Sequence, residues 1–173
     1  MTRLLLAFAL LGSHQTLAFD TQAANGLVKR YAETVACSIN PEAFKAVKVS
    51  GEPNSSQMGD EYAVYWEGDM GCAGGRGSVG AQLTIVRKNG LEEPVVDPFK
   101  KASDLNLVCA DQISVKDGII ILSGTTYGAN DRQSQPKKPV EVSLKVGFDD
   151  IKVVAVNTKP AVPALGSCVN NVR

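Results

Sequence analysis

The chain has 173 residues, of which 44% are apolar, and its 18 Lys and Arg residues balance 18 Asp and Glu residues. This length fits one domain of ordinary size, and the composition is that of a folded protein, not of a disordered segment. A neutral net charge argues against a nucleic-acid-binding protein, which normally has a basic surface. No stretch has the roughly 18 consecutive apolar residues that a transmembrane helix needs.

The first 18 residues have the three parts of a secretory signal peptide. Arg3 supplies a positive charge, residues 4–11 form a short apolar run, and positions 16 and 18 are the two that a signal peptidase reads. We therefore predict cleavage between Ala18 and Phe19, so that residues 1–18 are a signal peptide and residues 19–173 form one exported domain. No cysteine follows the apolar run directly, so the lipoprotein pattern is absent. The predicted location is the periplasm or outside the cell.

Cleavage at this point would leave 155 residues (173 − 18) and would remove His14, the one histidine of the chain. A chain without histidine has no Ser-His-Asp or Cys-His catalytic arrangement and no imidazole ligand for a metal. We therefore predict that the protein is not an enzyme and that it uses neither a cofactor nor a metal.

The four cysteines are Cys37, Cys72, Cys109 and Cys168. An even number of cysteines in an exported chain predicts two disulfides, for which three pairings are possible. We favour Cys37–Cys72 with Cys109–Cys168, because this pairing ties the N-terminal segment to a glycine-rich loop and holds the C-terminal tail. A zinc site is the alternative, but the chain has no CxxC pair.

The first predicted element of the exported domain is a helix. Asp20 or Thr21 can cap it, and it is expected to run to about Ala36. One of its faces is apolar and consists of Leu27, Val28, Tyr31 and Val35. Residues 40–42 can start a further helical turn, but the alternation from residue 46 predicts a short strand that ends at Gly51.

Short segments of strand character follow from residue 59 onward. They lie at residues 62–67, 81–85, 105–109, 113–116, 119–122, 140–148 and 151–156. Asp117-Gly118 is the strongest hairpin signal, because both residues tolerate the positive φ of a tight turn. Residues 94–98 contain two prolines and are predicted to be a connection. In residues 140–148 the alternation places Val140, Val142, Leu144, Val146 and Phe148 on one buried face.

Strands that recur every 8–12 residues with tight turns favour an antiparallel sheet over alternating parallel units. The predicted fold class is therefore α+β, with one N-terminal helix packed on an antiparallel sheet of six to seven strands. Such a sheet can also curl into a sandwich or half-barrel. Residues 157–173 contain Pro160 and Pro163 and are predicted to be an irregular tail, held by Cys168.

Residues 68–80 form a glycine-rich segment with Cys72 in it. Glycine-rich loops can cradle anions with backbone N–H groups, but a nucleotide P-loop needs GK[ST] and a following helix, which are absent here. We interpret the segment as a wide hairpin connection stapled by Cys72. If it binds a ligand, Arg76 is the natural partner for a carboxylate or phosphate.

Aromatic and acidic residues precede this loop. We expect Trp66 to be a core residue, whereas Tyr65 points to the opposite face of its strand and its exposure stays open. An exposed Tyr65 beside Asp69 would resemble an interface hot spot. Asp60, Glu61, Glu67 and Asp69 also raise two alternatives, a carboxylate-based glycan hydrolase and a calcium site. The calcium loop pattern is absent.

A long polar loop at residues 127–139 lies between two strong strand signals. Such loops on a rigid sheet often contact partners, and we name Asp131 and Arg132 as candidate binding residues. The pairs Lys100-Lys101 and Lys137-Lys138 are interpreted as solvated surface. If this loop and the glycine-rich loop lie at the same end of the sheet, together they would define a recognition surface.

The sequence thus predicts a small exported binding protein that recognises another protein or a component of the cell envelope, in the format of inhibitors and immunity proteins. The first alternative is the carboxylate-based hydrolase. It would gain support if Asp69 and Glu61 or Glu67 lay about 5–9 Å apart in a cleft. The second is a structural envelope protein that self-associates. Nucleic acid is not an expected partner.

Overall fold

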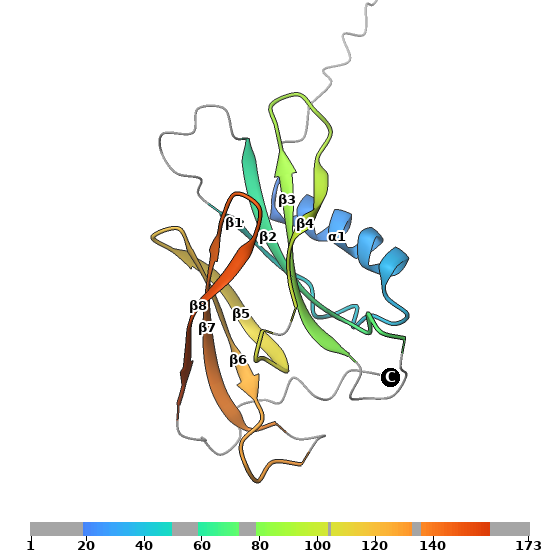
Figure 1. The fold of residues 1–173 in the computed structure, drawn as a ribbon. Coiled ribbons are helices and arrows are strands. Elements are labelled where there is room, and N and C mark those ends of the chain that lie inside the picture. The colour runs from blue at the N-terminus through green and yellow to red at the C-terminus, as the bar shows by residue number, and fades with distance from the viewer. Residues whose placement is uncertain (1–18, 50–58, 73–78, 104, 133–135, 160–173) are drawn as a thin grey trace, which may run out of the picture.

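One helix and two sheets form three layers (Figure 1). The structure is a computed structural model and describes residues 19–49, 59–72, 79–103, 105–132 and 136–159. Its elements are α1 (Thr21–Val35), β1 (Lys45–Val49), β2 (Asp60–Gly68), β3 (Gly80–Lys88), β4 (Val95–Ala102), β5 (Cys109–Lys116), β6 (Ile119–Thr126), β7 (Lys138–Val146) and β8 (Ile151–Thr158). The predicted signal peptide, Arg76, Cys168 and the tail from residue 160 lie outside the described residues.

The helix begins and ends close to the predicted positions. Asp20 is the N-cap residue, and its carboxylate accepts a hydrogen bond of 2.8 Å from the backbone N–H of Ala23. This bond satisfies one of the free N–H groups of the first turn. Ala24, Val28 and Ala32 are fully buried at the centre of the helix face that packs on the first sheet (β1–β4). The predicted apolar residues Leu27, Tyr31 and Val35 pack at its margins.

Strand β2 is covered on both faces, which explains why its sequence is apolar at successive positions. Tyr62, Val64 and Trp66 pack in one cluster with helix α1. Ala63 and Tyr65 point the opposite way and belong to the main core between the two sheets. Successive side chains of a strand alternate between faces, so a strand buried on both sides loses the apolar–polar alternation of a half-exposed one.

The second sheet (β5–β8) packs its apolar face against the first. Leu83 and Ile85 of β3 and Ile120 and Leu122 of β6 belong to the same core cluster and are fully buried. Each sheet is antiparallel, with its strands in sequence order. The expected α+β class and the antiparallel pairing are therefore confirmed, but the strand number was underestimated, and the strands form two separate four-stranded sheets, not one.

Strand β4 accounts for part of this difference, because residues 94–98 were predicted to be a connection. Pro98 lies within β4, at the edge of the first sheet, where a residue without a backbone N–H is tolerated. Thr84 pairs with Lys101 and Ile85 pairs with Asp97, so residues 98–100 form an irregular bulge that accommodates the proline. The predicted strand at residues 105–109 is instead the lead-in to β5.

The second sheet follows the sequence patterns closely. The β5–β6 hairpin turns at Asp117-Gly118, and both residues have positive φ (52° and 75°), as predicted. Strand β7 buries Val140, Val142 and Leu144, but it ends at Val146. Phe148 was predicted to share this buried face and is 77% exposed, because it lies in the turn that leads to β8. The irregular tail begins later than residue 157, since β8 continues to Thr158.

The predicted Cys37–Cys72 disulfide is confirmed, with a Cα–Cα distance of 5.3 Å. It connects the segment that follows α1 to the end of the β2 region, and the backbone pairs of Cys37 N–H with Asp69 O and Asp69 N–H with Ser38 O lie beside it. Cys109 is buried and has no free thiol. Its predicted pairing with Cys168 stays a prediction, because Cys168 lies outside the described residues.

Candidate functional site

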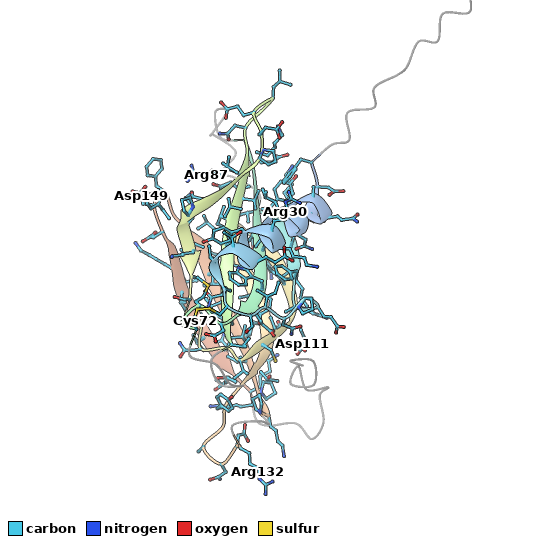
Figure 2. All side chains as sticks on the ribbon, turned by 90° about the vertical axis from the view of Figure 1, so that its right-hand side faces the viewer. Arg30, Cys72, Arg87, Asp111, Arg132 and Asp149 are labelled. Atoms are coloured by element: carbon cyan, nitrogen blue, oxygen red, sulfur yellow. A yellow bond between two sulfur atoms is a disulfide. The ribbon has the colours of Figure 1, made fainter. Side chains whose placement is uncertain are left out.

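The described ends of the two loops named in the sequence analysis lie in the same half of the molecule. The hydroxyl of Tyr65, near the end of β2, accepts a hydrogen bond of 3.0 Å from the N–H of Ala110 on β5. Cys109, the neighbour of Ala110, pairs with Thr125 at the end of β6. Figure 1 shows the described end of β2 and the β6–β7 loop both in the lower half of the view. The two segments therefore lie toward the same half of the molecule, but Figure 2 shows Cys72 near the middle and Arg132 at the lower extremity.

Tyr65 is fully buried and takes part in a polar network between the two sheets. Its hydroxyl donates to Glu67 over 2.7 Å, and the other carboxylate oxygen of Glu67 accepts from the Asn40 side chain over 2.9 Å. Burial, the negative charge of Glu67 and the hydrogen bond to it all raise the pKa of Tyr65 far above its ordinary value. The phenol therefore stays protonated and bridges the sheets, and its side chain does not reach the surface.

The carboxylates near β2 are spread along the strand, and each is engaged. Asp60 forms an exposed ion pair with Lys48 over 2.6 Å. Glu67 is held by Asn40 and Tyr65 as described above, and Asp69 is 3% exposed and accepts a hydrogen bond of 3.2 Å from the N–H of Gly71. Glu61 lies near the start of β2 and Asp69 follows its end, roughly 25 Å away along an extended chain, and Glu67 and Asp69 are both buried. These placements favour structural roles for the four carboxylates.

Glu61 belongs to a second polar cluster, which also contains Arg87, Asp97 and Lys100. Lys100 lies 3.2 Å from Glu61, the Nε atom of Arg87 lies 3.6 Å from Glu61, and the other end of the Arg87 guanidinium pairs with Asp97. Burial raises the pKa of Asp97, but hydrogen bonds from the N–H groups of Phe99 and Lys100, together with Arg87, bring it below the ordinary value. The four charges cancel, and the cluster joins β2, β3 and β4.

This cluster corrects the interpretation of the Lys100-Lys101 pair as solvated surface. Lys101 is exposed, but Lys100 is 4% exposed and reaches across β3 to Glu61 on β2. The bulge at Pro98 turns Lys100 inward, and no local sequence pattern signals this. Arg87 and Asp97 were not singled out in the sequence for the same reason.

The side chain of Asp131 joins the two described parts of the β6–β7 loop, residues 127–132 and 136–137. One carboxylate oxygen of Asp131 accepts a hydrogen bond of 2.8 Å from the N–H of Gly128 and another of 2.8 Å from the N–H of Lys137. These two bonds hold the pKa of Asp131 below its ordinary value. Pro136, the neighbour of Lys137, is buried. Asp131 therefore joins the beginning of the loop to its end.

The loop presents an aromatic and a cationic side chain outward. Tyr127 is 44% exposed, and Arg132 and Lys137 are also exposed. Figure 2 shows Arg132 at the lower extremity of the molecule, away from the body of the sheets. Of the predicted binding residues, Asp131 and Arg132 thus share this loop, Tyr65 and Asp69 are buried, and Arg76 lies outside the described residues.

No group of three or more His, Cys, Asp or Glu side chains within the described ranges is arranged to hold a metal ion. None of the helices in the same ranges is long and apolar enough to cross a membrane. A comparison with protein-family models, curated proteins and solved structures finds no match for this chain.

Proposed function

We propose that this protein is an exported, non-catalytic binding protein and that the β6–β7 loop (residues 127–137) contacts its partner, a protein or an envelope component with an anionic surface. The observation that carries the proposal is the pair of hydrogen bonds from the N–H groups of Gly128 and Lys137 to Asp131. They fix the ends of a long loop before any partner arrives. Loop ends that are already held in place lose less conformational entropy on binding than free ones.

The side chains that the loop presents are of the kinds that dominate interfaces. Tyrosine and arginine supply a large part of the binding energy in many complexes, because each combines apolar area with a polar end. Residues 127–139 contain three basic residues, Arg132, Lys137 and Lys138, against the single acidic residue Asp131. Since the carboxylate of Asp131 is turned toward the backbone of the loop, the outward charge is positive.

The test is affinity capture from an extract of the exported compartment at low and high salt. The wild-type protein should retain a partner at low salt, and the retention should weaken as salt rises, because screening reduces attraction between exposed charges. The variants Y127A and R132E should each lower the retained amount about tenfold or more, in line with the loss of a hot-spot residue.

The matched control is R30E, a charge reversal on the exposed side of helix α1, far from Arg132 in Figure 2. This variant should retain the partner like the wild type. The proposal fails if R30E and R132E weaken capture equally, or if nothing is captured at any salt concentration.

A further inference from the structure

Strand β8 is an outer strand of the second sheet and its most exposed strand. Six of its eight residues are exposed. Three of them are valines, with exposed fractions of 42% for Val153, 52% for Val154 and 41% for Val156. An edge strand offers unpaired backbone N–H and C=O groups, and an apolar edge is a template for another strand.

The other three edges are better protected against pairing. Strand β4 contains Pro98 and three charged residues, and proline and charges are common means of blocking an edge. Strand β5 carries two charged residues, Asp111 and Lys116. Strand β1 has only five residues and lies beside β5. Strand β8 also contains a bulge and lies close to β4 at some of its residues. It has no proline, however, and Lys152 is its only charged residue.

A bulge in β8 places two of these valines on one face. Val153 pairs with Leu144 and Val156 pairs with Val142, so one extra residue is inserted between them. Leu144 and Val142 both point into the core, and partners opposite each other in a ladder point to the same face. Val153 and Val156 are an odd number of residues apart and would face opposite ways in a regular strand. Here both lie on the core-facing side, yet remain exposed.

We propose that β8 pairs with β8 of a second copy of this chain, antiparallel, with the two-fold axis between residues 154 and 155. In this register Val153 of one copy lies opposite Val156 of the other, which is a cross-strand apolar pair formed twice. Residues that pair across a two-fold axis must point to the same face of the sheet. The bulge makes this register possible, because it places Val153 and Val156 on the same face.

The charges fit the same register. Asp150 of one copy lies opposite Lys159 of the other, and Lys152 lies opposite Asn157, so no like charges meet. Asp150 and Lys152 already form an exposed ion pair of 3.3 Å within one chain. The N–H of Lys159 bonds to the carbonyl of Pro139, so the chain is still paired with β7 at this end of the strand. A second copy thus supplies complementary charges at both ends of the pairing.

The tail of the same chain is a poorer occupant of this edge. It follows β8 directly and begins with Pro160, and Pro163 follows; neither has an N–H group for a ladder. The predicted Cys109–Cys168 bridge would also draw the tail toward β5, at the opposite edge of the second sheet from β8.

The test is sedimentation velocity of the purified, disulfide-bonded protein over a wide concentration range. The wild type should shift from monomer to dimer as concentration rises. V153K should raise the dimer dissociation constant about tenfold or more, because it places a charge in the apolar pair. F99S on β4 is the matched control, since Phe99 is 82% exposed on another edge strand, and it should leave the dimer unchanged.

A charge exchange tests the register itself with substitutions at exposed positions. D150K and K159D should each weaken the dimer, and the double variant D150K/K159D should restore it. A protein that stays monomeric at every concentration overturns the proposal. So does a dimer that F99S disrupts and V153K does not, or a double variant that is weaker than both single variants.

Discussion

At the scale of single residues, the buried polar side chains of Tyr65, Glu67 and Asn40 hold the layers together and are not available for chemistry at the surface. The Tyr65 hydroxyl both accepts from Ala110 N–H and donates to Glu67, so one atom links the two sheets and satisfies a buried carboxylate. A buried polar group that loses its partner costs more than the bond contributes when formed. Tyr65 is therefore a residue at which a small change should have a large effect.

We expect Y65F to lower the free energy of unfolding by about 1–3 kcal/mol, because the N–H of Ala110 and one oxygen of Glu67 lose their partner in the interior. Urea unfolding followed by circular dichroism measures the change. Y62F is the comparison, since the Tyr62 hydroxyl donates to the carbonyl of Phe19 in a partly buried place that water can replace. Equal losses in the two variants would contradict the role given to Tyr65.

The Asp131 carboxylate gives a prediction about pH. Its pKa is lowered in the folded protein by the N–H groups of Gly128 and Lys137. The order that it gives the loop is therefore complete above the ordinary carboxyl pKa of about 3.9 and is lost as pH falls through the lower, folded value. The amide NMR signals of Gly128 and Lys137 should shift together with a midpoint below about 3.9.

The variant D131N is the control for this titration. The two amide signals should no longer respond in the acidic range, because the titrating group is gone. If they still titrate together in D131N, another carboxylate orders the loop.

At the scale of elements, helix α1 and the β5–β6 hairpin follow from local signals, whereas β4 depends on its neighbours. The cap at Asp20 and the positive φ at Asp117 and Gly118 are properties of a few adjacent residues. Strand β4 contains a proline and exists because β3 supplies hydrogen bonds on one side. Its formation brings Lys100 to Glu61, a contact between residues 39 positions apart.

Removal of the helix cap should be measurable at this scale. D20A should destabilise the protein by about 1 kcal/mol, since the Ala23 N–H loses its partner at the start of α1. D20N should retain most of the stability, because asparagine caps helices about as well as aspartate. A thermal melt of both variants decides the matter, and equal melting temperatures for D20A and the wild type would show that the cap contributes nothing.

At the scale of the whole molecule, the first sheet is the middle of three layers, and its strands β2 and β3 contribute side chains to both apolar clusters. The helix packs on one face of β2 and β3, and the second sheet packs on the other, so the two apolar clusters meet in the same sheet. The Cys37–Cys72 bridge joins the segment after the helix to the end of the β2 region. It closes a loop that spans 35 positions and includes β1 and β2.

Loss of this bridge should act on the whole fold. In the chain-entropy description, closing a loop of this length stabilises the native state by up to about 4 kcal/mol. The double variant C37S/C72S should therefore unfold at a clearly lower urea concentration than the oxidised wild type, with all probes of structure changing together. An unchanged unfolding midpoint would mean that hydrogen bonds such as Cys37 N–H to Asp69 O hold this corner without the sulfurs.

The sequence by itself determined the helix with its Asp20 cap, the Asp117-Gly118 hairpin and the antiparallel class, and it favoured the Cys37–Cys72 pair among three possible pairings. Each of these depends on residues close in the chain or on the limited set of cysteine pairings. Only the tertiary structure decided that the strands divide into two sheets, that Tyr65 and Lys100 are buried, and that β8 is left exposed. The physical reason is that burial and strand pairing at these positions depend on which distant segment of the chain lies opposite. The alternation of apolar and polar residues along a strand shows that its two faces differ, but it does not show which segment covers each face.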